Sequence, residues 1–233
     1  IQPVITVLLY WFVFEFGLHQ KVNDLRTGIE VPFVLWLMGG LVPWFYFQEA
    51  LNGGTGVLDE YSYLVKKVVF QIDALPVVKL ISALFTHAFF VVFMLVVFAV
   101  MGFYPDLYVL QVVYYSFCMV TFTAGLIYAT SAVTVFFRDM KEVVAILLQI
   151  GMWVTPIMWN FESMQGIPKW AVVLLKLNPM YYIVSGYRDA LINKTAFWEH
   201  PGLTLWFWGI TLFTLWAGTT VFKRLRVHFA DVL

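Results

Sequence analysis

Long runs without a charged side chain constrain this sequence more than any other feature. No Lys, Arg, Asp or Glu occurs at positions 107–137 or at positions 143–161. Hydrophobic residues form 62% of the chain and charged residues only 12%, whereas soluble domains contain about 25% charged residues. The chain is therefore predicted to be an all-α integral membrane protein, because helices pair every backbone group internally.

We predict six membrane-spanning helices, since one span needs about 20 apolar residues. The apolar runs do not alternate with polar residues as barrel strands do. The first run looks cut short, because the chain begins inside it without Met, and we expect an N-terminal piece to be missing. The six predicted spans are 1–17, 31–51, 76–101, 107–137, 143–160 and 202–222.

Basic residues in the short connections predict the orientation of these spans. Three basic clusters, at 66–67, 138–141 and 223–226, fall on the same side of the membrane. Most basic residues of the opposite side lie in the long segment 161–201, and long segments weigh less in this rule. The clustered side is predicted to be cytoplasmic, together with both chain ends.

The predicted connection between the fourth and fifth spans is short and highly charged. It reads FFRDMKEV at 136–143 and contains Arg138, Asp139, Lys141 and Glu142. One interpretation is that these charges only anchor two helix ends in the membrane interface. The other is that the turn contacts a cytoplasmic partner.

Segment 53–75, between the second and third spans, is also predicted to be cytoplasmic. Its glycines at 53–56 end the second helix, since glycine weakens a helix interior. Apolar residues then recur at three- and four-residue spacing, which predicts an amphipathic helix over 58–68. That helix lies on lipid or docks into a groove of a soluble partner. Its apolar positions are Leu58, Tyr61, Leu64, Val65 and Val68.

Segment 161–201 is predicted to form two short helices, KWAVVLLKL and MYYIVSGYRDALI, that re-enter the outer leaflet. Pro168 and Pro179 mark their starts. Non-helical backbone at membrane depth is tolerated where protein or a water-filled cavity covers it. This re-entrant hairpin would place Arg188 and Asp189 near the outer surface.

Aromatic residues form 19% of the chain, and an interfacial belt accounts for many of them. The PWFYFQ stretch fits a belt less well, and its Pro43 predicts a broken, kinked helix. His87 is either a functional residue or a side chain bonded to a neighbouring helix. Because aromatic faces suit sugar rings, we assign a candidate substrate path to Trp44, Phe45, Tyr46, Phe47, His87, Trp153 and Trp159.

Several functional classes fit the sequence poorly. The formal net charge is zero, which argues against a nucleic-acid partner. Cys118 is the single cysteine, and no Cys/His cluster suggests a metal. The glycines at 53–56 are not followed by the Lys-Ser/Thr of a phosphate-binding loop. No catalytic Ser/His/Asp grouping and no chain of intramembrane carboxylates is visible, so an enzyme or ion-coupled carrier is the weaker interpretation.

Five motifs, in order, give the chain a family resemblance. They are GGLVPWFYFQEAL at 39–51, LVKKVVFQIDALPVVKL at 64–80, VFFRDMKEVVAILLQIGMWVTPIMW at 135–159, LNPMYYIVSGYRDAL at 177–191 and FKRLRVHFADVL at 222–233. With the predicted spans, this arrangement resembles the permease subunits of type-2 ABC exporters for lipid-linked polysaccharides. The VPFVLWLMGGLVPWFYF and HFADVL stretches resemble the teichoic acid export branch, and O-antigen or capsular polysaccharide export is the alternative.

The resemblance implies a transporter subunit rather than an enzyme, in a bacterial cytoplasmic membrane. Two copies would pair, and two separate ATPase subunits would bind the ATP and Mg²⁺, so this chain would hold no cofactor. It also implies a missing N-terminal amphipathic helix. A membrane-embedded glycosyl or acyl transferase, or a channel, remains the alternative from another class. The implied ATPase-coupling residues are Leu58, Tyr61, Leu64, Lys66, Lys67, Arg138, Asp139 and Lys141, and the implied outer exit is formed by Tyr181, Tyr182 and Arg188.

Overall fold

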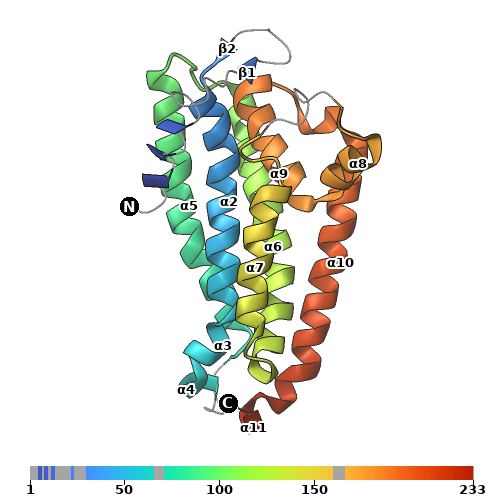
Figure 1. Cartoon of the computed structure of the whole chain (residues 1–233). Helices are drawn as coiled ribbons and strands as arrows, with labels where there is room; N and C mark the ends of the chain where they lie inside the picture. The colour runs from blue at the N-terminus through green and yellow to red at the C-terminus, as the bar shows by residue number, and fades with distance from the viewer. Residues whose placement is uncertain are drawn as a thin grey trace.

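The computed structural model is an elongated bundle of long helices with short helices at both ends (Figure 1). It describes residues 5–6, 8–9, 12–13, 22–23, 30–65, 71–159 and 166–232. One end of the bundle, here called the α3 end, holds α3 (Val57–Glu60), α4 (Ser62–Val65) and the C-terminal α11 (Phe229–Val232). The opposite end, the α8 end, holds α8 (Lys169–Leu177) and a hairpin of two strands with two residues each.

The long helices connect these two ends. They are α2 (Phe33–Thr55), α5 (Ala74–Val100), α6 (Gln111–Phe136), α7 (Met140–Val154) and α10 (Pro201–Leu225). Strands β1 (Val22–Asn23) and β2 (Glu30–Val31) pair antiparallel, with Val22 opposite Val31. The remaining short elements are η2 (Leu107–Leu110), α9 (Pro179–Arg188), the π-helical turn η4 (Asp189–Asn193), η5 (Phe197–Glu199) and η6 (Arg226–His228).

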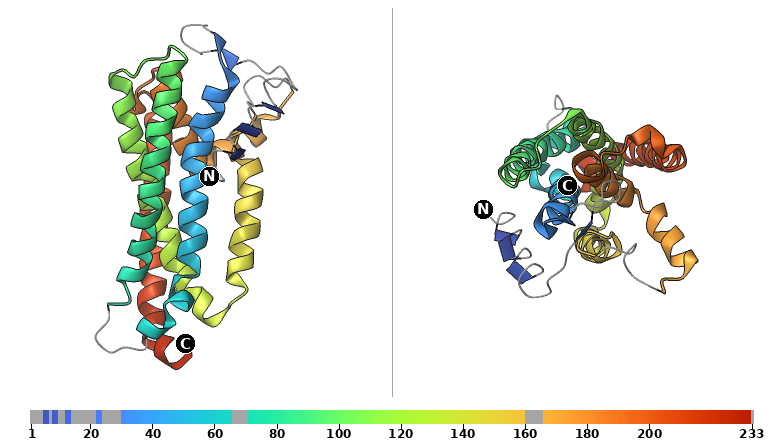
Figure 2. Two further views of the ribbon diagram at one scale, coloured as in Figure 1. Left: turned by 90° about the vertical axis from the view of Figure 1, so that its left-hand side faces the viewer. Right: turned by 90° about the horizontal axis from the view of Figure 1, so that it is seen from above.

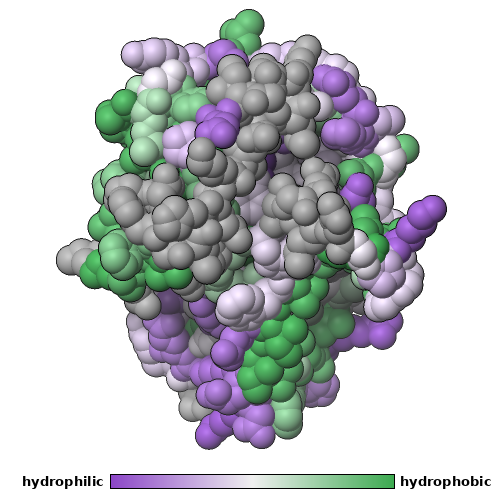
Figure 3. Space-filling model, turned by 45° about the horizontal axis from the view of Figure 1, so that its top comes forward, coloured by the Kyte–Doolittle hydropathy of each residue, from purple (hydrophilic) through white to green (hydrophobic). Residues whose placement is uncertain are grey.

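Three helices of the described residues are long and apolar enough to cross a membrane. They are Ala74–Val100, Leu107–Phe136 and Pro201–His228, and they match the third, fourth and sixth predicted spans. Figure 3 shows a hydrophobic stripe on the flank of the bundle and hydrophilic residues gathered at its lower end. Most of the first predicted span, 1–17, falls outside the described residues.

Helix α2, the second predicted span, is the core of the bundle rather than a lipid-facing helix. Eighteen of its 23 residues are buried, and α5, α6, α7 and α9 pack around it. The helix continues through Pro43, so the prediction of a break there is wrong. The helix ends at Thr55, and Gly56 follows as its C-cap, as the glycine stretch predicted.

Helix α7 is shorter than the predicted span 143–160. Its 15 residues reach about 22 Å at 1.5 Å per residue, less than the roughly 30 Å of a bilayer core. The helix ends because Pro156 disfavours helical backbone at the residue before it, and Thr155 is indeed extended, with φ −76° and ψ 127°. Figure 2 shows α7 at the edge of the bundle, beside α2.

Segment 161–201 contains the two short helices that its prolines predicted. Helix α8 begins after Pro168, and α9 begins at Pro179. The Asn178 side chain caps α9 by accepting a hydrogen bond from the Met180 N–H at 3.0 Å. The depth of these helices in a membrane stays a prediction.

Candidate functional site

The α3 end is held together by its own small apolar cluster. Val57 and Leu58 of α3 are fully buried in it. The other members come from the ends of α5, α6, α10 and α11, so α3 shares one buried cluster with the ends of four helices. The other buried members are Leu75, Ala132, Val135, Phe222 and Phe229.

The predicted amphipathic helix over 58–68 is not one helix in the structure. Helices α3 and α4 have four residues each and are separated at Tyr61, whose φ of −107° and ψ of 28° leave the helical region. Leu58 is buried against neighbouring helices, and its assignment to ATPase coupling stays a prediction. Tyr61 is half-buried. The side chain of Leu64, together with Lys66, Lys67 and Val68, lies outside what the structure describes.

The turn between α6 and α7 lies at the same end of the molecule and is exposed. Phe136 and Phe137 are 44% and 49% accessible to solvent, and Arg138 and Asp139 are exposed beside them. Two aromatic rings next to two charges form a surface that a protein partner can bind.

Three ion pairs connect helix ends at the α3 end. Lys141, at the start of α7, reaches Asp59 of α3 with Nζ 2.7 Å from Oδ2. Lys79 of α5 reaches Glu60 of α3 at 2.8 Å, and its hydrogen bond lowers the pKa of the Glu60 carboxyl. Arg226, after α10, pairs with Asp73.

A cavity of about 230 Å³ lies between α2, α6 and α7. Trp44 and Phe47, two of the predicted path residues, line it. Its lining is mainly apolar, with polar side chains at Thr130, Thr155 and Asn178. The remaining lining residues are Leu51, Phe122, Leu126, Val144, Leu147, Leu148, Gly151 and Met180.

The other predicted path residues do not line this cavity. Phe45 packs edge-on against Phe90, and the buried Tyr46 donates a hydrogen bond to the Leu80 carbonyl at 3.4 Å. Trp153 is exposed on the outer face of α7. Trp159 donates its indole N–H to the Trp153 carbonyl at 3.0 Å.

His87 belongs to a buried polar cluster between three helices. Its Nε2 lies 2.9 Å from the Tyr187 hydroxyl and 3.3 Å from Ser116 Oγ. Ser116 and Tyr187 are themselves 2.6 Å apart. The interpretation of His87 as a side chain bonded to neighbouring helices fits these contacts.

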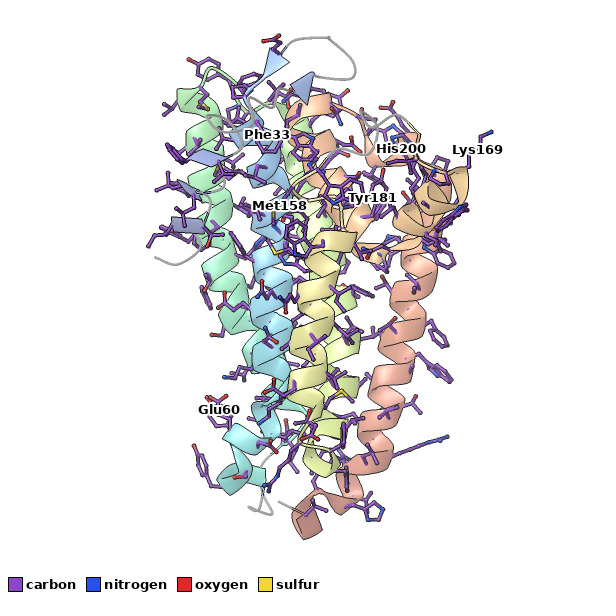
Figure 4. All side chains as sticks on the ribbon, viewed as in Figure 1. Phe33, Glu60, Met158, Lys169, Tyr181 and His200 are labelled. Atoms are coloured by element: carbon purple, nitrogen blue, oxygen red, sulfur yellow. The ribbon has the colours of Figure 1, made fainter. Side chains whose placement is uncertain are left out.

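The three residues of the predicted outer exit are buried in this conformation, and their role as an exit stays a prediction. Tyr181, Tyr182 and Arg188 are each no more than 7% exposed, because α9 packs against α2, α6 and α10. Figure 4 labels Tyr181, which belongs to α9, and Lys169, which marks the exposed start of α8.

Arg188 joins α9 to α2 and to the end of α7. Its guanidinium donates hydrogen bonds to the carbonyls of Pro156 at 2.8 Å, Ile157 at 2.7 Å and Trp36 at 3.3 Å. It also stacks 3.4 Å above the Trp36 ring, a favourable cation–π geometry. Arg188 is therefore a structural connection between three segments.

Gly39 and Gly40 leave the space on α2 that the Arg188 side chain occupies. A Cβ on Gly40 would lie 2.8 Å from Arg188 Nη2, and one on Gly39 would lie 3.3 Å from Arg188 Cγ. Sequence reasoning missed this role, although paired glycines inside an apolar helix are a signal of close packing. It also missed Asp59 as the partner of Lys141, because nothing local connects them.

Comparisons with known proteins agree with the family resemblance. The sequence matches the ABC-2 type transporter family over residues 1–192 of its 233 residues. It is 26% identical to the O-antigen export system permease protein RfbA of Myxococcus xanthus, over 99% of this chain and 85% of the relative.

Two further relatives cover nearly the whole chain. The RfbA protein of Klebsiella pneumoniae is 24% identical over 100% of this chain and 85% of its own length. The polysialic acid transport protein KpsM of Escherichia coli is 24% identical over 96% of this chain and 83% of its own length. The names of these relatives support the prediction of a transporter subunit. The family match covers most of this chain and shows that the chain belongs to the ABC-2 type transporter family.

Proposed function

We propose that this chain is the permease subunit of an ATP-driven exporter of a lipid-linked cell-envelope polysaccharide. The observation that carries the proposal is the similarity, over at least 96% of the chain, to proteins named for O-antigen export and polysialic acid transport. The names of these relatives favour O-antigen or capsule-like polymers over wall teichoic acid, which stays the alternative substrate.

The partner would be an ABC ATPase that docks at the α3 end, with two copies of each chain in the complex. The α3 end would face the cytoplasm of a bacterium, since the basic clusters at 138–141 and 223–226 lie there. Arg138 and Asp139 project beside exposed Phe136 and Phe137 at this end, so the turn has the composition of a protein-binding surface.

The cavity between α2, α6 and α7 would form part of the polysaccharide path. Its lining combines the aromatic faces of Trp44 and Phe47 with three polar side chains. The buried indole N–H of Trp44 has no hydrogen-bond partner among the described residues, and it would become available to a sugar hydroxyl once the cavity opens. At about 230 Å³ the cavity is smaller than the roughly 300–1,000 Å³ of small-molecule sites, so it would widen during transport.

The experiment that tests the function is reconstitution of the full-length chain with its ATPase in lipid vesicles. ATP hydrolysis and polymer translocation are measured with lipid-linked O-antigen, capsular polymer or teichoic acid added separately. Stimulation by one polymer, with ATP-dependent translocation of it, supports the proposal and identifies the branch. Nucleotide-independent flux, or no complex with an ATPase, would overturn it in favour of a channel or a transferase.

Replacing Arg138 with Glu is expected to weaken binding of the ATPase by about tenfold, because a reversed charge at an interface rim is repelled by its former partner. Co-purification with the ATPase and transport both measure this. Lys169→Glu, an exposed charge reversal at the opposite end, is the control and is expected to bind normally. The loss of ATPase binding supports a partner contact only if both variants insert into the membrane equally well. Reduced insertion of Arg138→Glu alone would favour the anchoring interpretation.

Replacing Trp44 with Leu is expected to lower polymer export about fivefold, the worth of one aromatic stacking contact, while basal ATP hydrolysis continues. Trp216→Leu is the matched control, because Trp216 is 65% exposed on α10 and lines no part of the cavity. Export rates per folded complex measure the difference. Normal export by Trp44→Leu would assign Trp44 to structural packing alone.

A further inference from the structure

We propose that α7 pivots about its α8 end, and that the Lys141–Asp59 ion pair is the latch that fixes its other end to α3. This inference rests on the proposed function and adds a movement and a positioning residue, Lys141, to it. The argument comes from how differently the two ends of α7 are held.

The α8 end of α7 is held by buried, directional contacts. Arg188 donates to the carbonyls of Pro156 and Ile157, at 2.8 and 2.7 Å, just beyond the helix. Asn178 donates its side-chain N–H to Thr155 Oγ1 at 2.8 Å. Thr155 and Ile157 are fully buried, so water does not compete for these hydrogen bonds, and breaking them would leave polar groups unpaired.

The rest of α7 is packed much more loosely. Val144 and Leu148 are its only buried residues, and both line the cavity under the helix. Its outer face is exposed, with accessible fractions of 55% at Ile146 and 53% at Ile150. Few contacts therefore oppose movement of the half of α7 that lies nearer the α3 end.

Lys141 connects that looser half to α3. Its Nζ lies 2.7 Å from Asp59 Oδ2, and its side chain crosses Gly56, where an added Cβ would lie 3.1 Å from Lys141 Cε. Among the described residues, this is the one ion pair between α7 and α3. The pair is partly exposed, at 45% and 22% of the two side chains, so it is weak enough to open and close.

Helix α3 is itself fixed to the bundle through buried Val57 and Leu58. A partner that docks at this end and shifts α3 together with the helix ends packed on it would displace α7 through Lys141, while the Arg188 contacts hold the far end. The result is a tilt of α7 that widens the cavity toward the α3 end. This gives the narrow cavity a way to admit a polymer.

The test measures the two ends of α7 separately by spin-label distances in the full-length chain, diluted with unlabelled chain in lipid. Labels at Glu142 and Lys223 report the α3 end, and labels at Val154 and Leu205 report the α8 end. If α7 tilts outward, the label distance at the α3 end becomes longer. In Lys141→Glu we expect the population with this longer distance to rise up to about fivefold, which corresponds to the upper range of the energy of an exposed ion pair. The α8-end distance is expected to stay unchanged.

A charge swap separates the ion pair from other effects of the substitution. The double variant Asp59→Lys with Lys141→Asp is expected to restore the wild-type distances, and to restore polymer exported per ATP to within about twofold. Lys79→Glu is the matched control, because it breaks an ion pair of α3 with α5 and is expected to leave the α7 distances unchanged. Failure of the swap to restore them would overturn the latch, and equal changes at both ends would overturn the pivot.

The label distances also distinguish this proposal from the proposed function. They require neither an ATPase nor a polymer, so they test the latch even if reconstituted export fails. Normal ATP-driven export with unchanged distances in Lys141→Glu would retain the function and reject the latch.

Discussion

Replacing Gly218 with alanine is expected to cost roughly 3 kcal/mol of stability or more, because no space exists for the added methyl group. Helices α6 and α10 touch at this point through their backbones. A Cβ on Gly218 would lie 2.0 Å from the Gly125 carbonyl oxygen, and one on Gly125 would lie 2.7 Å from the Leu215 nitrogen. Since backbone atoms cannot rotate away, the helices must separate. Thermal unfolding in detergent measures the loss.

Gly209 offers a matched control on the same helix, because nothing lies within 4 Å of an added Cβ there. Gly209→Ala is expected to be neutral, or to stabilise by up to about 1 kcal/mol through helix propensity. Gly125→Ala should resemble Gly218→Ala, since both open the same contact. Equal unfolding temperatures for Gly209→Ala and Gly218→Ala would contradict the close packing of α6 on α10.

Replacing Arg188 with methionine is expected to destabilise the chain by roughly 3 kcal/mol or more, because leaving one buried polar group unsatisfied costs about 1–3 kcal/mol and three carbonyls are affected. The carbonyls of Trp36, Pro156 and Ile157 would each lose a buried donor. Arg188→Lys is expected to recover little of this loss, because a single ammonium does not reproduce the planar fork of guanidinium donors. Folded yield and unfolding temperature measure both variants.

Arg224 provides the control for loss of charge, since it is exposed near the end of α10. Arg224→Met is expected to change stability by less than about 0.5 kcal/mol, as surface substitutions usually do. If Arg188→Met proves as stable as Arg224→Met while export falls, Arg188 acts at an exit rather than as a structural connection.

The segments that the sequence predicted well are those defined by consecutive residues. Predicted span 76–101 is found as Ala74–Val100, and predicted span 107–137 as Leu107–Phe136. Helix α9 starts at Pro179, because proline at the first helical position sacrifices no hydrogen bond. Helix α8 starts directly after its N-cap, Pro168. Pro156 also indicated that α7 ends early. The prediction relied on hydropathy alone and therefore placed the end of this helix too far along the chain.

The candidate site was predicted less completely, because its residues meet only in the folded chain. Trp44 and Phe47 of the predicted substrate path line a cavity, whereas Tyr46, on another face of the same helix, lies in the core. The use of this cavity as a path stays a prediction. Arg188 resembled a surface arginine in the sequence, whereas three carbonyls and the Trp36 ring surround it in the structure.

The sequence by itself determined that this chain is a helical membrane protein, where its long apolar helices lie and which family it belongs to. Only the tertiary structure decided which apolar faces are buried against other helices and which stay exposed. Both environments are apolar, so side chains that face lipid and side chains that face another helix are equally hydrophobic. Helix α2 is buried by its neighbouring helices, and Lys141 pairs with Asp59. Neither fact follows from hydropathy, which describes residues one at a time, because both depend on packing between distant segments.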